Sequence, residues 1–564
     1  MKWILIFLSL GWYSYTASQS LNFDWVVTFG SQAQDRGEFI ALDDSGNSYV
    51  TGWFTDTIQF GNDVFDLSTQ ISAYNSFVLK LDPEGKVVWA KALASVGAPP
   101  GLSQSLGIHI DPLGDVLVVG EFANDIDFDP GSGSNIVSAL GVDFFILKLD
   151  ASGDFKWVKT YSGTSFLNRS YSVTTDKFAN IYTVGFFHDS VDFDPGPSTF
   201  MLRSDGGRDC FVQKLDPSGD FLWAKAYGGP GNEGLYSISG VNDSVFYLTG
   251  SFSDSVDFDP GPSEHLLYSE SSESAYVLKL DQDGNFRWAS SIQGNGFSYA
   301  FSVNADRFEN ALVSGWFQDT VDFDPGFASY PIAMESQFFD MFVWKLDKNG
   351  DFVWAKNIGG GLIAQGESIS SDLQDNVYVT GYYLGTTDFD PGPAVVERTN
   401  NGAFILSLDV NGDFVWLTTL ESSNYAEGET IVFDANGQDV FVTGHFIDTL
   451  YADTAFSNNV YPGEGDRDIF VLKYTDEMVA IPTLEEHASV SVFPNPTAGF
   501  LHFKHGNYQK DFTLRISDQQ GRILRKYGPA EVKHHIEFDH PPGIYFATFS
   551  SGGLVKTVKF VIAR

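Results

Sequence analysis

Several residue types are scarce in this 564-residue sequence, and each scarcity excludes a class of protein. The single cysteine, Cys210, rules out an intramolecular disulfide framework and a cysteine-based metal cluster, and we expect it to be a buried small hydrophobe. Only 33 Lys and Arg oppose 73 Asp and Glu, which excludes nucleic acid because phosphate binding needs a basic patch. No apolar run is long enough to form a transmembrane helix.

Catalytic signatures are also missing from the sequence. There is no Gly-x-Ser-x-Gly, no His-Glu-x-x-His and no phosphate-cradling loop. The histidines His109, His188, His265 and His445 occur in unrelated contexts, so we expect each to be a surface or packing residue. The sequence therefore favours a protein without catalysis, although acid and base residues can be far apart along a chain.

The abundant residue types point to a β-rich protein with a charge boundary. Aromatic residues make up 15% of the chain and there are 56 glycines, a composition that suits many short strands and turns. The net charge is -40, yet residues 488–564 contain 10 Lys and Arg against 5 Asp and Glu. This shift predicts two domains, with a linker at residues 476–487.

Residues 1–20 have the pattern of a secretory signal peptide. Lys2 supplies the positive n-region, residues 3–10 form a short apolar run, and residues 16–18 are small, as at a cleavage site. We expect the signal to be removed and the mature protein to be secreted.

Internal repetition is the strongest signal in residues 21–475. Seven of the twelve tryptophans recur at spacings of 62 to 68 residues, and glycines that end phrases such as YVTG give the same count. The tryptophans are Trp25, Trp89, Trp157, Trp223, Trp288, Trp354 and Trp416. The glycines are Gly52, Gly120, Gly185, Gly250, Gly315, Gly381 and Gly444.

Each repeat reads as four β-strands. In one repeat, residues 367–372, 376–381 and 413–417 alternate between polar and apolar side chains, and residues 403–409 are apolar. Seven such units predict a seven-bladed β-propeller of four-stranded blades, whereas the alternative, a linear β-solenoid, usually has much shorter repeats. The last unit lacks its tryptophan strand, so the N-terminal strand should complete it, placing Trp25 and Val471 in one sheet.

The repeated phrases resemble a known family. Residues 211–223 (FVQKLDPSGDFLW), followed by Tyr227-Gly-Gly and residues 236–239 (YSIS), resemble the secreted bacterial β-propeller repeat, SBBP, a relative of the NHL-type propellers. The resemblance covers residues 22–475 and implies architecture and export. It implies no activity, because the family has no uniform one and fold alone does not determine function.

Five repeats carry the phrase Asp-Phe-Asp-Pro-Gly between their second and third strands. Both carboxylates face one side of an extended segment before Pro-Gly turns the chain. Such clustered oxygens suit Ca²⁺, whereas the structural alternative is that Phe fills the blade edge and the two Asp bond the turn. The candidate ligands are Asp127, Asp129, Asp192, Asp194, Asp257, Asp259, Asp322, Asp324, Asp388 and Asp390.

The C-terminal residues 488–564 are predicted to form a small β-sandwich of about seven short strands. The phrases Phe493-Pro-Asn-Pro-Thr497, Gly543-Ile-Tyr545-Phe and Lys556-Thr-Val-Lys559 resemble the type A sorting domain of the type IX (Por) secretion system. This resemblance implies contact with that machinery in a Gram-negative bacterium, followed by release or attachment to the outer surface. The alternative is an accessory binding sandwich.

Two functions are compatible with these features. The first is a non-catalytic surface or secreted propeller for adhesion, or for glycan or protein capture. The second is a secreted propeller hydrolase or lyase that acts on polysaccharide. His, Tyr, Arg or Glu side chains converging at the mouth of the channel would favour the second, whereas only Gly, Ser and Asp there would count against catalysis.

Overall fold

The computed structural model divides into two compact units, Met1–Asp476 and Glu477–Arg564. It describes residues 22–60, 66–67, 74–97, 100–163, 167–241, 244–259, 261–452 and 459–475, and, in the second unit, 491–493, 500–504, 513–518, 522–527, 535–537, 540–541, 543–551 and 554–562. The predicted signal peptide and linker lie outside these residues. The described residues are all-β, as predicted, and contain no helix that could cross a membrane.

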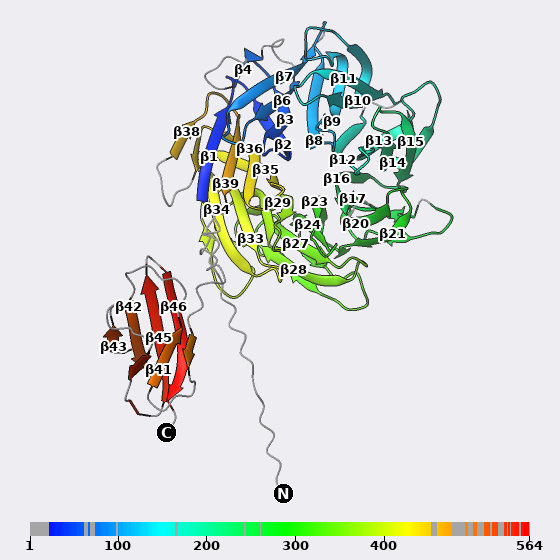
Figure 1. The fold of residues 1–564 in the computed structure, drawn as a ribbon. Coiled ribbons are helices and arrows are strands. Elements are labelled where there is room, and N and C mark those ends of the chain that lie inside the picture. The colour runs from blue at the N-terminus through cyan, green and yellow to red at the C-terminus, as the bar shows by residue number, and fades with distance from the viewer. Residues whose placement is uncertain are drawn as a thin grey trace. The chain divides into compact units, whose positions relative to one another are not determined.

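The first unit is built from antiparallel four-strand units. The four main strands pair in their order along the chain, except that the N-terminal strand supplies the fourth strand of the last unit. Figure 1 shows their first strands gathered toward a common centre. The first strands are β2 (Asp35–Leu42), β8 (Leu102–Ile110), β12 (Arg169–Thr175), β16 (Glu233–Val241), β23 (Ser298–Ala305), β29 (Ile363–Ser371) and β35 (Tyr425–Phe433). The second strands are β3 (Ser48–Phe54), β9 (Val116–Asp127), β13 (Ile181–Asp192), β17 (Val245–Phe252), β24 (Ala311–Phe317), β30 (Val377–Leu384) and β36 (Asp439–Ile447).

The outer strands complete each four-strand unit. The third strands are β6 (Asn75–Leu81), β10 (Ile136–Leu149), β14 (Met201–Leu215), β20 (Ser274–Asp281), β27 (Asp340–Leu346), β33 (Asn401–Leu408) and β39 (Asp468–Thr475). The fourth are β7 (Val87–Ser95), β11 (Phe155–Tyr161), β15 (Phe221–Tyr227), β21 (Phe286–Ser291), β28 (Phe352–Ile358), β34 (Phe414–Ser422) and, from the N-terminus, β1 (Asn22–Phe29).

Short strands lie in the connections between these elements. Two further pairings join or extend the main sheets. β7 pairs with β9 and so joins two units into one sheet, and β37 extends the sheet of β34. The short strands are β4 (Ile58–Gln59), β5 (Asp66–Leu67), β18 (Ser255–Asp257), β19 (Leu266–Tyr268), β22 (Gln293–Gly294), β25 (Thr320–Asp322), β26 (Pro331–Ala333), β31 (Thr387–Asp388), β32 (Glu397–Arg398), β37 (Thr449–Ala452) and β38 (Asn459–Pro462).

The N-terminal strand pairs with the last strand of the first unit, as predicted. β1 lies antiparallel to β39, with Trp25 opposite Lys473 and Val27 opposite Val471. Two segments about 450 residues apart in sequence therefore share one sheet, and β1 covers the outer edge of β39. An uncovered edge would present unpaired backbone N–H and C=O groups to other chains.

The repeated tryptophans hold neighbouring units together. Trp25 donates its ring N–H to the carbonyl of Pro83, 3.1 Å away, and Trp354 does the same to Val410 at 3.1 Å. Both carbonyls belong to a four-residue Asp-x-x-Gly turn of the following unit, residues 82–85 and 409–412. The turn glycine has a positive φ, and a Cβ on Gly85 would lie 2.8 Å from the Trp25 ring. The tryptophan and turn-glycine repeats are thus two sides of one contact.

The hydrophobic core lies between adjacent sheets. One cluster combines Tyr182 and Val212 of one unit with Leu248 and Leu278 of the next, all of them fully or almost fully buried. Cys210 belongs to this cluster and is 1% exposed, so its prediction as a buried hydrophobe is confirmed. Each sheet thus needs its neighbours to bury both of its faces.

The second unit contains two antiparallel sheets in its described residues. The three-stranded sheet has the order β40-β41-β44, and the four-stranded sheet has the order β43-β42-β45-β46. Their seven strands agree with the predicted number of about seven: β40 (Ser491–Phe493), β41 (Phe500–Lys504), β42 (Thr513–Asp518), β43 (Ile523–Tyr527), β44 (His535–Glu537), β45 (Gly543–Ser551) and β46 (Leu554–Ile562).

Candidate functional site

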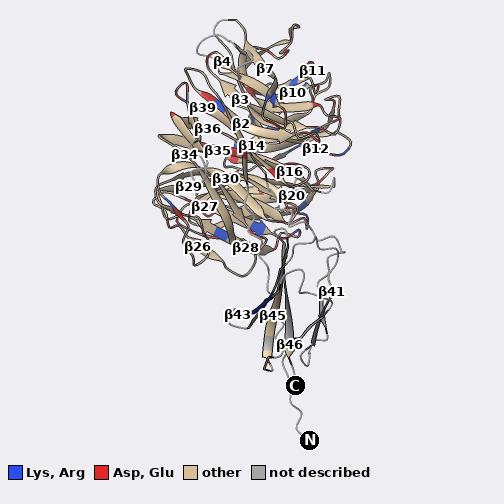
Figure 2. Cartoon of the chain, turned by 60° about the vertical axis from the view of Figure 1, so that its left-hand side comes forward, with Lys and Arg blue, Asp and Glu red and all other residues tan. Residues whose placement is uncertain are grey.

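The Asp-Phe-Asp-Pro-Gly loops follow the second strands, at the end of each sheet where the predicted position places them. Figure 2 shows that the strands of this unit are mostly neutral, with acidic positions mainly at strand ends and in loops. The same end carries the connection from the preceding unit, because the Asp388 N–H donates to the carbonyl of Gly359 at 2.9 Å. Each of the five loops belongs to a different four-strand unit.

The two carboxylates of each loop accept hydrogen bonds from the loop's own backbone. Asp192 Oδ1 accepts the N–H groups of Asp194 at 3.1 Å and Phe200 at 2.8 Å. Asp194 Oδ1 accepts the N–H of Gly196 at 2.8 Å. The same three bonds recur in the loops that begin at Asp127, Asp257, Asp322 and Asp388.

The phenylalanine of each loop is buried in the core. Phe193 is fully buried, with its ring centroid 5.0 Å from that of Phe211, and Phe128, Phe323 and Phe389 are buried to the same extent. The burial and the backbone hydrogen bonds are those expected of a structural motif. The structure does not test calcium at the ten candidate aspartates.

A second feature repeats on the first strands. Each contains a β-bulge, where the register with the second strand skips one residue. The repeated glycine lies opposite the bulge: a Cβ on Gly52 would lie 1.9 Å from the Arg36 carbonyl oxygen, and one on Gly444 would lie 2.0 Å from that of Glu427. The glycine therefore makes room for the bulged backbone.

The residue left over at each bulge belongs to a set that we call the bulge residues. A bulge bends its strand and changes the direction of a side chain, a device common next to binding sites. Just beyond this set, the first strands line a cavity of about 590 Å³ that reaches Ser237, Ser302, Ser368 and Thr430. The bulge residues are Glu38, Leu106, Tyr171, Tyr236, Phe301, Glu367 and Glu429.

Three consecutive bulge residues are aromatic. Tyr171 and Tyr236 have ring centroids 5.2 Å apart in an edge-to-face arrangement, and Phe301 follows at 6.0 Å from Tyr236. All three are partly exposed. Arg169 lies with its guanidinium carbon 5.6 Å from the centre of the Tyr171 ring and binds both carboxylate oxygens of Glu121, at 2.5 and 2.6 Å. The row of rings is a rigid apolar surface with a cation at one end.

Three of the remaining four bulge residues carry carboxylates: Glu367, Glu429 and Glu38. Arg36 donates through Nε to Glu429 Oε1 at 3.0 Å and lies 3.2 Å from Glu38 Oε1. Glu38 also accepts the ring N–H of Trp53 at 3.0 Å. Glu367 accepts a hydrogen bond from Gln365. One guanidinium thus serves two of the three carboxylates.

Burial makes the ionised forms of these acids costly. It raises the pKa of Glu38 to about 7, because desolvation outweighs the nearby Arg36 charge. The pKa of Glu367 is raised well above its usual value by burial and by the charges of Glu427 and Glu429. These carboxylates therefore differ from the loop aspartates, which accept hydrogen bonds from the backbone N–H groups of their own loop.

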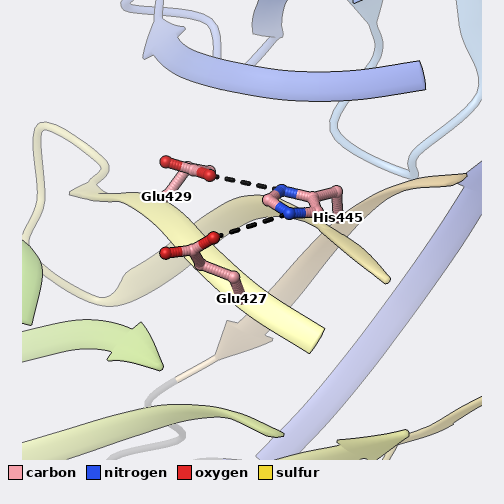
Figure 3. A group of neighbouring side chains, drawn as sticks. All are labelled: Glu427, Glu429 and His445. Atoms are coloured by element: carbon pink, nitrogen blue, oxygen red, sulfur yellow. Dashed lines mark ion pairs between the residues drawn. The ribbon is translucent and has the colours of Figure 1, made fainter. Parts of the chain in front are cut away.

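His445 on β36 lies between two glutamates of β35. Figure 3 shows its ring nitrogens directed at Glu427 and Glu429, with Nε2 3.5 Å from Glu427 Oε2 and Nδ1 3.2 Å from Glu429 Oε1. Tyr425 donates to Glu427 Oε2 at 2.6 Å and stacks on the imidazole, with centroids 5.6 Å apart. His445 is fully buried, and burial holds its pKa well below the usual value.

His445 is buried, as expected of a packing residue, but it also lies beside two carboxylates. The other three histidines make single polar contacts: His109 with Thr175 Oγ1, His188 with the Leu167 carbonyl and His265 with the Ala289 carbonyl. A signal for the bulge residues exists in the sequence. Five of the seven precede Ser or Thr, in phrases such as Tyr236-Ser-Ile-Ser and Glu367-Ser-Ile-Ser, and an alignment of the repeats places aromatic and acidic residues in one column.

A family comparison identifies the C-terminal part of the chain. Residues 491–563 match the model of the secretion system C-terminal sorting domain, named for the Por system. The predicted sorting domain is thus present, and it implies export of a secreted or cell-surface protein through the type IX secretion machinery.

The chain has more distant similarities to other proteins. An uncharacterized WD repeat-containing protein of Acanthamoeba polyphaga mimivirus is 24% identical over 331 residues, which span 49% of this chain and only 24% of that protein. The PQQ domain of pyranose dehydrogenase from Coprinopsis cinerea aligns with 10% identity over 67% of this chain and 95% of its own, with a TM-score of 0.30. PorZ of Porphyromonas gingivalis, a surface component of the type IX secretion system, aligns with 12% identity over 96% and 100%, with a TM-score of 0.16.

Proposed function

We propose that the mature protein is an exported seven-bladed propeller, closed by β1 and followed by its sorting domain. In this assignment residues 21–475 are the propeller, 476–487 the linker and 488–564 the sorting domain. The four-strand units, the pairing of β1 with β39 and the sorting-domain match support the assignment. Removal of the signal at residues 1–20 would precede passage through the outer membrane.

The function that the geometry supports best is glycan binding at the bulge residues. The observation that carries it is the row formed by Tyr171, Tyr236 and Phe301, partly exposed beside a cavity and continued by carboxylates. Ring faces present flat apolar surface to the C–H faces of a sugar, while carboxylates and guanidinium groups hydrogen-bond its hydroxyls. Adhesion or capture of extracellular polysaccharide would follow from such a site.

A glycan array with the full chain tests this proposal. We expect binding to one class of oligosaccharide, and Tyr236→Ala should weaken the binding about tenfold or more, as truncation of a central aromatic contact does. Phe327→Ala is the matched control, because Phe327 is fully exposed outside the bulge residues. No glycan binding, or equal losses in the two variants, would overturn the proposal.

A second candidate is a polysaccharide hydrolase or lyase. The observation in its favour is that Glu, His, Tyr and Arg side chains meet at one end of the first strands, the arrangement that distinguishes catalysis from binding alone. Paired carboxylates in different environments can act as general acid and base on a glycosidic bond. Release of new sugar ends from the bound glycan, lost in Glu367→Gln with binding retained, would support this candidate, and intact glycan after incubation would eliminate it.

Calcium at the Asp-Phe-Asp-Pro-Gly loops stays a prediction. A ligand that binds only the folded state must raise its stability, so millimolar Ca²⁺ should raise the melting temperature of the full chain at fixed ionic strength. Asp194→Asn should reduce the shift. An unchanged melting temperature would contradict the prediction.

A further inference from the structure

The environment of His445 is unusual for a buried histidine. Neither ring nitrogen has a hydrogen bond to any residue of the described part of the chain, although the side chain is fully buried and carboxylate oxygens lie 3.2 and 3.5 Å away. Buried polar groups nearly always have partners, and an exception calls for an explanation. The oxygens are near the nitrogens but do not lie where they would accept a ring N–H.

The charge around His445 is also unbalanced. Among the residues that the structure describes, Glu38, Glu367, Glu427 and Glu429 supply four carboxyl groups, beside the two guanidinium groups of Arg36 and Arg467. Arg467 is over the Tyr425 ring, 5.7 Å from its centre. Buried charges are ordinarily paired or bound to a metal ion.

From this arrangement we infer that Glu427, Glu429 and His445 bind one divalent transition-metal ion. One ligand atom from each residue lies within 4.8 Å of the others. Two ligands held at about 2.0–2.2 Å from one ion in tetrahedral geometry are about 3.4 Å apart and off the N–H direction. Either the contact of Nε2 with Glu427 Oε2 at 3.5 Å or that of Nδ1 with Glu429 Oε1 at 3.2 Å has this spacing, and one ion uses the ring nitrogen of only one of them.

The donor set indicates the class of ion. An imidazole nitrogen with two carboxylates suits Zn²⁺, Mn²⁺ or Fe²⁺ better than Ca²⁺ or Mg²⁺, which prefer oxygen ligands. Only one ring nitrogen can bind the ion, so the other stays beside a carboxylate, the support that metal-bound histidines usually have. Three protein ligands leave a coordination position for water or a bound molecule. Because Glu429 is a bulge residue, that position would adjoin the proposed glycan site.

Titration of the chelator-treated full chain with Co²⁺ tests the inference, because the visible absorption of bound Co²⁺ reports its ligands. We expect one ion per chain, displaced by Zn²⁺ but not by equal Ca²⁺. His445→Gln and Glu427→Gln should each weaken binding at least tenfold. His188→Gln is the control, since His188 Nδ1 already bonds the Leu167 carbonyl.

Three results would overturn the inference. They are the absence of bound Co²⁺ in the wild-type chain, unchanged affinity in Glu427→Gln, and displacement of Co²⁺ by equal Ca²⁺. Thermal melting without metal checks that the variants fold, and Glu427→Gln, which keeps the side-chain volume, carries the test if His445→Gln does not fold. Glycan binding at Tyr236 is measured separately, so failure of either proposal is distinguishable from failure of the other.

Discussion

Two acidic regions of the first unit contrast in how their carboxylates are satisfied. In the Asp-Phe-Asp-Pro-Gly loops, each carboxylate accepts backbone N–H groups of its own loop. Around His445, three glutamates from two different first strands, Glu38, Glu427 and Glu429, share the Arg36 guanidinium. A group of acidic residues is therefore a weak sign of a site when the local backbone already satisfies it, and a stronger one when burial leaves the charge unbalanced.

The contrast extends to the pKa values of the two regions. Burial alone would raise the pKa of Asp322, but hydrogen bonds from Ser329, Tyr330 and Asp324 outweigh it and leave that pKa lowered. Burial and the charge of Glu429 instead raise the pKa of Glu427. Hydrogen bonds within the loop favour the folded state with Asp322 ionised. Burial of ionised Glu427 instead costs folding free energy, unless a proton or a cation neutralises its charge.

The largest effect should come from the glycine that admits a bulge. Gly444→Ala would place a Cβ 2.0 Å from the Glu427 carbonyl oxygen, so the bulge that positions Glu429 could not form as it stands. We expect a loss above about 4 kcal/mol in the free energy of unfolding, measured by chemical denaturation. Gly240→Ala is the control, because its nearest neighbour would be 3.7 Å away. Equal stability of the two variants would refute this role of the glycine.

The loop phenylalanine should matter more than the loop carboxylates. Phe193→Ala removes a fully buried ring and should cost about 3–5 kcal/mol, measured in the same unfolding experiment. The exposed Phe327, changed to Ala, should cost less than about 0.5 kcal/mol. A small effect at Phe193 would mean that the loop is not anchored through its ring and would weaken the structural interpretation of the motif.

The first aspartate of a loop comes next in size. Asp192→Ala leaves the N–H groups of Asp194 and Phe200 without their acceptor and should cost about 1–3 kcal/mol. Asp216→Ala offers a comparison in a turn where the carboxylate also accepts two N–H groups. If Asp192→Ala were neutral in the absence of Ca²⁺, the carboxylate would not be structural and a ligand role would gain support.

The last effect concerns pH and a different buried acid, Glu233. Burial and the Asp209 charge raise the pKa of Glu233 to about 8 in the folded protein, against about 4.5 unfolded. The folded state thus holds a proton that the unfolded state releases, so this group's contribution to stability falls as pH rises from about 4.5 to about 8. Glu233→Gln should flatten melting temperature against pH over that interval. An unchanged pH profile would contradict the assignment.

The repeat patterns predicted much of the fold because they record local contacts. The tryptophan spacing predicted the repeat, the alternation of polar and apolar side chains predicted its four strands, and the missing tryptophan strand predicted the pairing of β1 with β39. The position of the loops between second and third strands was also predictable, because alternation and turn residues are encoded within a few positions. The repeated glycine served only as a second marker of the period, although its structural role is to face the bulge.

The sequence by itself determined the β-strands, their repetition and the charge boundary before the sorting domain. These follow from alternation, turn chemistry and composition, which act over short distances along the chain. Only the tertiary structure decided which side chains meet at the bulges. Arg36 and Glu429 are 393 residues apart and become neighbours because their two sheets pack against each other. The partners of His445 lie on another strand, so its environment depends on register, which a bulge shifts by one residue.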